Sequence, residues 1–298
     1  MTRSDLRLGM VGLGALGLPM AVNLHSAGFP LQVHTRSRKA ERNPALLGSQ
    51  GCATAAEAAC GVDVLVVCVS DDAAVNTVLF GQGGAAETLA EGSLVVDCST
   101  IAPSTSRAAA DQLALQKVNY IDAPVTGGTE GAQAGTLTVL VGGEPSDLKR
   151  ARPVLDIIGG TIHHFGPVGS GQQVKAVNQV LVAGSYVAVA EALALGERLG
   201  LPMPAVVDAL RHGAAGSWAL NHRSGAMLEG HYPLGFRLAL HHKDLGIALQ
   251  AAADVDLNLP IATKVRTMEE DLMTNGHGAE DVSCLRRWLD QAGKPAES

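Results

Sequence analysis

The N-terminal half of the chain alternates short apolar runs with longer amphipathic segments. Glycine or polar residues bound the runs, and the segments between them are long enough for helices. This alternation is typical of strands joined by helical crossovers in a mainly parallel sheet. We therefore expect strands at residues 6–11, 31–35, 62–69, 93–99, 119–123, 137–142 and 161–165.

The pattern changes after a glycine-containing turn at residues 166–169. Strand signals end there, and apolar residues recur at helical spacing. We expect helices at about 172–199, 203–212, 217–228, 240–254, 260–275 and 279–291. The sequence thus predicts a doubly wound α/β domain over residues 1–166, followed by an all-helical C-terminal domain over residues 167–298.

Composition narrows the class of protein. The 298 residues are 47% apolar, which is enough for two ordinary hydrophobic cores. A net charge of −7 and an aromatic content of 3% provide neither a basic surface nor stacking platforms for nucleic acid. Polar residues, among them Glu191, interrupt the apolar segment 174–195, so we expect a buried core helix and no membrane partner.

The five cysteines are odd in number and form no Cys-x-x-Cys pair. Cys68 and Cys98 lie in apolar runs that are expected to be buried strands. This pattern predicts reduced thiols and no metal site. The first glycine turn also precedes any segment long enough for a signal peptide, so we expect a cytoplasmic protein.

A glycine-rich turn with the pattern Gly-x-Gly-x-x-Gly follows the first predicted strand and opens a predicted helix. The three glycines allow a tight turn, close approach to a pyrophosphate and helix-on-strand packing, while the helix start supplies N–H groups. An ordinary glycine turn is the alternative, but the flanking strand and helix favour a Rossmann-type dinucleotide-binding domain. The residues expected to bind the dinucleotide here are Gly12, Leu13, Gly14, Ala15, Leu16 and Gly17.

The end of the second predicted strand bears on the choice between NAD and NADP. An NAD enzyme usually has Asp or Glu here for the ribose 2′-hydroxyl, but residues 34–39 include no acid. Arg36, with Arg38 or Lys39, could instead hold a 2′-phosphate. We therefore expect NADP to be preferred over NAD, with Thr35, Arg36 and Arg38 at the cofactor. The alternative is a solvated basic loop.

A second glycine-rich stretch runs from Asp122 to Gly135. Consecutive glycines after a strand can form an anion-binding nest of backbone N–H groups, and Thr126 adds a hydroxyl. A substrate carboxylate would suit Thr126, Gly127 and Gly128. A plain strand-to-helix turn is the alternative.

Two later patterns place polar residues in apolar helices. Lys175 and Asn178 are three positions apart, hence neighbours on one helix face. In such surroundings the pKa of a lysine can fall from about 10.4 toward neutrality, as acid–base work requires; a lysine that snorkels to solvent is the alternative. Lys243 and Asp244 begin another predicted helix, where a surface ion pair is the simpler interpretation.

Together, these four motifs resemble the β-hydroxyacid dehydrogenase family, related to 6-phosphogluconate dehydrogenase, in order and over residues 8–245. The resemblance implies that Lys175 donates or accepts the proton in carbonyl reduction or alcohol oxidation. It also implies that Asn178 and Gln179 bind substrate, with Thr126, Gly127 and Gly128 on its carboxylate. The further cofactor contacts that it implies are Val69, Ser70, Thr100 and Lys243.

Gln179 stands where many relatives have a second asparagine, and the Lys-x-x-Asn-Gln pattern looks closer to tartronate semialdehyde (2-hydroxy-3-oxopropionate) reductases. A dehydrogenase for 3-hydroxyisobutyrate, L-threonate, serine or a D-β-hydroxyamino acid is the alternative among enzymes. A dinucleotide-binding scaffold or sensor is the alternative outside them, because a fold alone does not establish activity. The apolar, charge-poor helical half also predicts a homodimer or homotetramer.

Overall fold

The computed structural model describes residues 5–292, and the chain divides into two compact units, residues 1–175 and 176–298. The boundary lies within a helix, beyond the turn at which the sequence analysis placed it.

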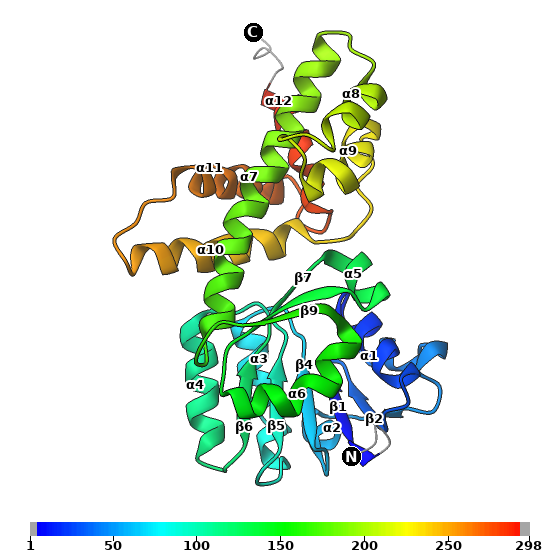
Figure 1. Cartoon of the computed structure of the whole chain (residues 1–298), viewed down its shortest axis with the longest axis vertical. Helices are drawn as coiled ribbons and strands as arrows, with labels where there is room; N and C mark the ends of the chain where they lie inside the picture. Colours follow the sequence, from blue (N-terminus) through cyan, green and yellow to red (C-terminus); the bar gives the residue numbers. More distant parts are fainter. Residues whose placement is uncertain (1–4, 293–298) are drawn as a thin grey trace. The chain divides into compact units, whose positions relative to one another are not determined.

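The first unit is built on a six-stranded, wholly parallel sheet with the strand order β3-β2-β1-β4-β5-β6 (Figure 1). This order is that of dinucleotide-binding doubly wound sheets. The strands are β1 (Leu8–Val11), β2 (Leu31–His34), β3 (Gln50–Gly51), β4 (Val64–Val67), β5 (Leu94–Asp97) and β6 (Asn119–Asp122).

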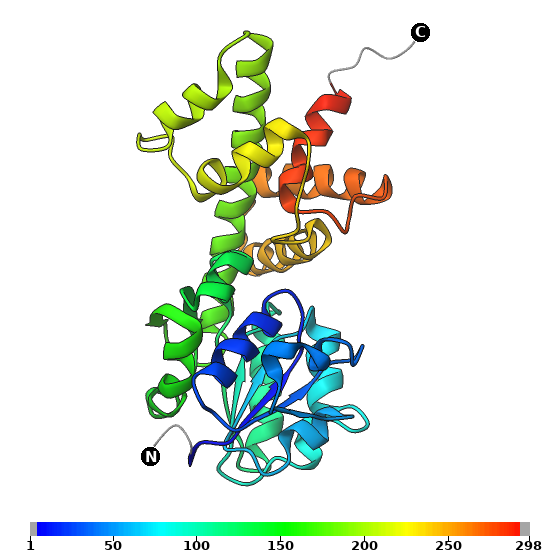
Figure 2. The same ribbon diagram turned by 90° about the vertical axis from the view of Figure 1, so that its right-hand side faces the viewer.

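Helices cover both faces of this sheet (Figures 1 and 2). Because strand side chains alternate between faces, Val64 and Val66 join one core cluster while Leu65 and Val67 join the other. On the Val64 face lie α1 (Gly17–Ser26) and α6 (Pro145–Ile158). On the Leu65 face lie α2 (Ala55–Ala59), α3 (Asp72–Phe80) and α4 (Pro103–Ala114). The predicted apolar runs are therefore strands buried on both sides.

A second, three-stranded sheet departs from the expectation of one sheet. Its order is β7-β8-β9, with β7 antiparallel and β9 parallel to β8. Its strands are β7 (Val125–Thr126), β8 (Leu137–Val141) and β9 (Gly159–His164), and α5 (Gly128–Ala134) lies between the first two. The two-residue strands β3 and β7 are too short to show a hydrophobic pattern, which is why the sequence did not predict them.

The second unit is helical, as expected. Its helices are α7 (Ser170–Arg198), which begins in the first unit, α8 (Met203–Leu210), α9 (Trp218–Glu229), α10 (Leu238–Ala253), α11 (Pro260–Thr274) and α12 (Leu285–Ala292). One apolar cluster, including Leu193, Leu220, Leu245 and Leu272, joins them. The last α-helix begins later than predicted because the buried Asp281 carboxylate accepts hydrogen bonds from Gly235, Phe236 and Ser283 N–H groups and caps a 3-10 turn at Val282–Cys284, directly before α12.

Helix α7 is not buried all round. By length and composition alone it could cross a membrane, and 39% of its most apolar window is buried. Ala183, Ala190 and Leu193 pack in the core, whereas Leu181 and Leu195 are 69% and 62% exposed. The prediction of a buried core helix therefore holds for one face of α7 only.

Candidate active site

In the first unit, the predicted cofactor residues gather at the carboxyl ends of the parallel strands. The glycine turn follows β1, Val69 and Ser70 follow β4, and Thr100 follows β5. The chain order reverses between β1 and β4, and ligands of open parallel sheets bind beyond the strands at this switch point. The Val69 N–H donates to Ser99 Oγ at 2.9 Å, which ties the end of β4 to the end of β5.

The glycine turn has the close approaches that its pattern predicts. Gly12 has φ +97°, and a Cβ there would collide with the Cys68 carbonyl oxygen. A Cβ on Gly17 would collide with the Gly12 carbonyl oxygen, so α1 packs directly onto the turn. These two glycines are required by the fold itself.

Gly14 differs, because a Cβ there would meet no protein atom within 4 Å. Its backbone is therefore open to a ligand. No side chain caps the N-terminus of α1 and no acidic residue lies in its first turn, which leaves the positive end of the helix for an anion. The residues present fit a dinucleotide pyrophosphate.

At the end of β2 the structure adds an acid that the sequence analysis did not expect. Glu41 accepts hydrogen bonds from the Thr35 N–H at 2.8 Å and from Arg38 Nε at 2.7 Å, and its side chain is only 5% exposed. Arg36 is exposed. The basic loop is thus partly ordered by Glu41, a residue too far along the chain to be assigned to this strand end from sequence.

The second glycine-rich stretch forms a tight turn between β7 and α5. Thr126 ends β7, and Gly127 and Gly128 both have positive φ, +128° and +68°. Such a turn directs successive N–H groups to the same side, which suits a carboxylate.

Asp122, at the start of this stretch, has a role that the sequence analysis did not anticipate. Its buried carboxylate accepts hydrogen bonds from the Gly169 N–H at 2.7 Å and the Gln172 N–H at 2.9 Å. It therefore anchors the start of α7 to the end of β6. Burial raises the pKa of Asp122 to about 6, although these N–H donors act to lower it.

The Gln172 side chain adds two further bonds. Its Nε2 donates to the Ser99 carbonyl oxygen at 2.8 Å, and its Oε1 accepts from the Ile101 N–H at 3.2 Å. Lys175 follows less than one helical turn later and is buried, with 7% of its surface exposed. The first turn of α7 thus fixes Lys175 relative to the carboxyl ends of β5 and β6.

In the second unit, Asn178 and Gln179 on α7 and Asp244 on α10 form a hydrogen-bonded chain. Asn178 Nδ2 donates to Gln179 Oε1 at 2.7 Å, and Gln179 Nε2 donates to Asp244 Oδ2 at 2.7 Å. Lys243 Nζ lies 2.8 Å from Asp244 Oδ1. Asp244 is 3% exposed and lies in the middle of α10, so this is not the surface pair at a helix start that the sequence suggested.

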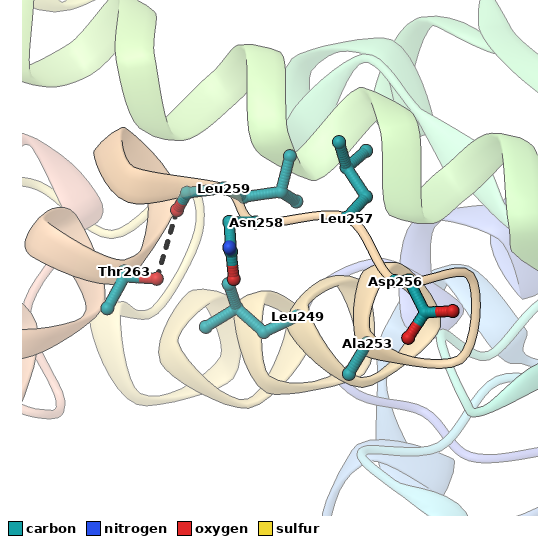
Figure 3. Close-up of a pocket in the computed structure, with 7 residues that line it drawn as sticks. All are labelled: Leu249, Ala253, Asp256, Leu257, Asn258, Leu259 and Thr263. Carbon is teal, nitrogen blue, oxygen red and sulfur yellow. Dashed lines mark hydrogen bonds between the residues drawn. The ribbon is translucent and has the colours of Figure 1, made fainter.

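Two other features do not mark the site. Over residues 5–292, no group of three or more His, Cys, Asp or Glu side chains could hold a metal ion. A pocket of about 490 Å³ opens at the connection between α10 and α11 (Figure 3), but none of the predicted site residues lines it. Its lining is Leu249, Ala253, Asp256, Leu257, Asn258, Leu259 and Thr263.

Comparison with known proteins agrees with this architecture. Residues 7–166 match the family described as the NAD binding domain of 6-phosphogluconate dehydrogenase, and residues 169–289 match the NAD-binding region of NADP-dependent 3-hydroxyisobutyrate dehydrogenase. A 2-hydroxy-3-oxopropionate reductase of Escherichia coli is 36% identical over 285 residues, covering 96% of this chain and 97% of the relative.

Two further relatives extend the comparison. An NAD-dependent L-serine dehydrogenase of Pseudomonas aeruginosa is 34% identical, covering 95% of this chain and 98% of the relative. Among solved structures, that of Psf3 in complex with NADP+ and 2-OPP matches with a TM-score of 0.89 at 27% identity, over 95% of this chain and 99% of that one. The chain therefore belongs to the β-hydroxyacid dehydrogenase family of NAD(P)-dependent oxidoreductases.

Proposed function

We propose that the protein interconverts 2-hydroxy-3-oxopropionate (tartronate semialdehyde) and the corresponding hydroxy acid, glycerate, with NADP preferred over NAD. The observation that carries the proposal is the buried Lys175 on α7, with Asn178 one helical turn further along. The E. coli relative named for this substrate aligns with nearly the whole chain, which supports the choice among hydroxy acids.

The chemistry follows from this arrangement. When bound, the nicotinamide supplies or accepts the hydride. In reduction, the hydride adds to the aldehyde carbon, the carbonyl electron pair moves to oxygen, and the Lys175 ammonium gives that oxygen its proton. In oxidation, neutral Lys175 takes the hydroxyl proton as the hydride leaves the carbon. Thr126 with the N–H groups of Gly127 and Gly128 would hold the substrate carboxylate.

The preference for NADP rests on the basic loop after β2. Arg36 and Arg38 supply donors for a 2′-phosphate, and Glu41 binds Arg38 through Nε, which leaves the two terminal nitrogens of that guanidinium for a ligand. Because one relative is named as NAD-dependent, the KM values of NADP+ and NAD+ are the direct test of this preference.

We also propose that the protein is a homo-oligomer in which α7 packs against a second copy of itself. The exposed apolar residues Val177, Leu181 and Leu195 lie along one face of α7, and the exposed Leu199 directly follows the helix. Their positions are symmetric about Ala188, so two antiparallel helices that cross there would pair Val177 with Leu199 and Leu181 with Leu195. A self-complementary pattern of this kind suits a two-fold interface.

The test is a purified-protein assay of NADPH and NADH with 2-hydroxy-3-oxopropionate, and of NADP+ and NAD+ with glycerate, L-serine, 3-hydroxyisobutyrate and L-threonate. We expect Lys175→Ala to lower kcat by about 100-fold or more, and Lys149→Ala, at an exposed lysine on α6, to leave it unchanged. Near-full turnover by Lys175→Ala would remove its acid–base role. Binding of NADPH without turnover of any of these compounds would favour a dinucleotide-binding scaffold.

A further inference from the structure

The hydrogen-bonded chain of Asn178, Gln179 and Asp244 in the second unit ends on the Asp244 carboxylate. The proposed function gives this carboxylate no role. Gln179 is 1% exposed and Asp244 is 3% exposed, and both ends of the Gln179 amide are engaged. A buried amide with both ends paired is fixed in orientation, since turning it over would break both bonds.

The direction of this chain follows from the chemistry of its last member. A carboxylate only accepts hydrogen bonds, so Gln179 must present Nε2 to Asp244. The opposite end of the same amide, Oε1, then faces Asn178, which must present Nδ2. A reversed Asn178 amide would set two carbonyl oxygens against each other.

We propose that Asp244 is a positioning residue, which orients the Asn178 amide through Gln179. It fixes the Asn178 Oδ1 as the acceptor left for a ligand, and a substrate hydroxyl group is the matching donor. The inference rests on the proposed function and on the substrate contact that the family resemblance implies for Asn178. Gln179, which sequence reasoning assigned to the substrate, acts here as the link between Asp244 and Asn178.

The second oxygen of Asp244 adds a further constraint. Its Oδ1 lies 2.8 Å from Lys243 Nζ, so one buried carboxylate holds both Lys243 and Gln179. The ion pair with Lys243 and the hydrogen bond from Gln179 thus engage the two oxygens of the same carboxylate. An asparagine at this position would remove that constraint, because its side chain can present either an oxygen or an NH2 group to Gln179.

The experiment is a double-mutant cycle on kcat/KM, measured with whichever of glycerate, L-serine and 3-hydroxyisobutyrate the wild-type enzyme oxidises fastest. The variants are Asp244→Asn and Gln179→Met, each alone and combined with Asn178→Ala. Gln179→Met keeps the side-chain length but removes the link, and leaves the pair of Asp244 and Lys243 in place. Asp254→Asn, at the exposed acid that follows the last residue of α10, is the matched control.

We expect Asp244→Asn and Gln179→Met each to lower kcat/KM for the hydroxy acid by about 10- to 100-fold, because a misdirected contact group costs on this order. In the Asn178→Ala background the same changes should cost less than about two-fold, since the group that they orient is already gone. Asp254→Asn should retain wild-type kinetics. Far-ultraviolet circular dichroism checks that each variant is folded.

Equal losses with and without Asn178 would overturn the inference, because they would mean that Asp244 acts on the fold and not through Asn178. If Asp244→Asn does not fold, Gln179→Met alone decides the question in the same cycle. If the Asn178→Ala and Lys175→Ala variants each kept full activity, the proposed function would be refuted instead. Loss of activity in those two variants with full activity in Asp244→Asn and Gln179→Met would refute only the positioning role.

Discussion

Replacing Asp122 with asparagine would change how the stability of the first unit depends on pH. The Asp122 carboxylate is buried under the start of α7, and burial raises its pKa from 3.8 to about 6. In the unfolded chain the same group ionises freely in water. Ionisation of Asp122 therefore costs more free energy in the folded protein than in the unfolded chain. The protonated form of Asp122 thus favours the folded state, and ionisation removes that stabilisation.

The sign and size follow from the two pKa values. Because the folded-state pKa is the higher one, the stabilising contribution is complete below about pH 3.8 and is lost as the pH rises through about 6. A displacement from 3.8 to about 6, at about 1.4 kcal/mol per pH unit, corresponds to about 3 kcal/mol. The asparagine side chain of the variant does not titrate, so the stability of wild type relative to Asp122→Asn should fall by about this amount between pH 4 and pH 7.

The assay must report on the first unit. Trp218 and Trp288 both lie in the second unit, so tryptophan fluorescence would miss the effect. Hydrogen exchange of peptides from β4 and β5, with wild type and variant compared at each pH, measures the opening free energy of the sheet. Asp111→Asn, at an exposed acid on α4, is the matched control. A constant difference between wild type and Asp122→Asn from pH 4 to pH 7 would refute the reasoning.

Three further results are expected. Arg38→Ala should raise the KM for NADP+ about 10-fold with little change for NAD+, since it removes a charged contact to the 2′-phosphate; equal effects on both cofactors would contradict the assignment. Gly14→Val should weaken NADPH binding in isothermal titration but keep the unfolding temperature, whereas Gly17→Val should destabilise the fold because its side chain would collide with backbone. Leu181→Glu should lower the mass measured by light scattering relative to wild type; a wild-type monomer of 30.6 kDa would exclude the α7 interface.

Hydrophobic pattern predicted the strands and helices that bury many apolar side chains. The runs at residues 62–69 and 93–99 are strands β4 and β5, because continuous burial on both faces leaves a continuous apolar signal. The two-residue strand β7 carries no such signal. β7 pairs with β8, and the two belong to a second sheet. Which strands pair depends on contacts between separate segments of the chain, and the local hydrophobic pattern does not encode those contacts.

The candidate site was predictable where function imposes a local pattern. The glycine turn and the spacing of Lys175 and Asn178 are readable because they lie within one turn or one helix. The Glu41 side chain folds back onto the Thr35 nitrogen, six residues earlier, at 2.8 Å, and the Asp244 side chain reaches Gln179 on another helix at 2.7 Å. Nothing in a single sequence distinguishes these acids from solvated ones.

The attachment of α7 to the first unit also bears on how substrate choice could change in this family. Four hydrogen bonds hold Gly169 and Gln172 to the ends of β5 and β6, and Gln172 lies less than one helical turn before Lys175. The backbone just before this lysine is thus tied to the sheet of the first unit. Under the proposed function, substitutions in the helices after Lys175 would change which hydroxy acid is recognised while this tie to the sheet keeps the lysine in place.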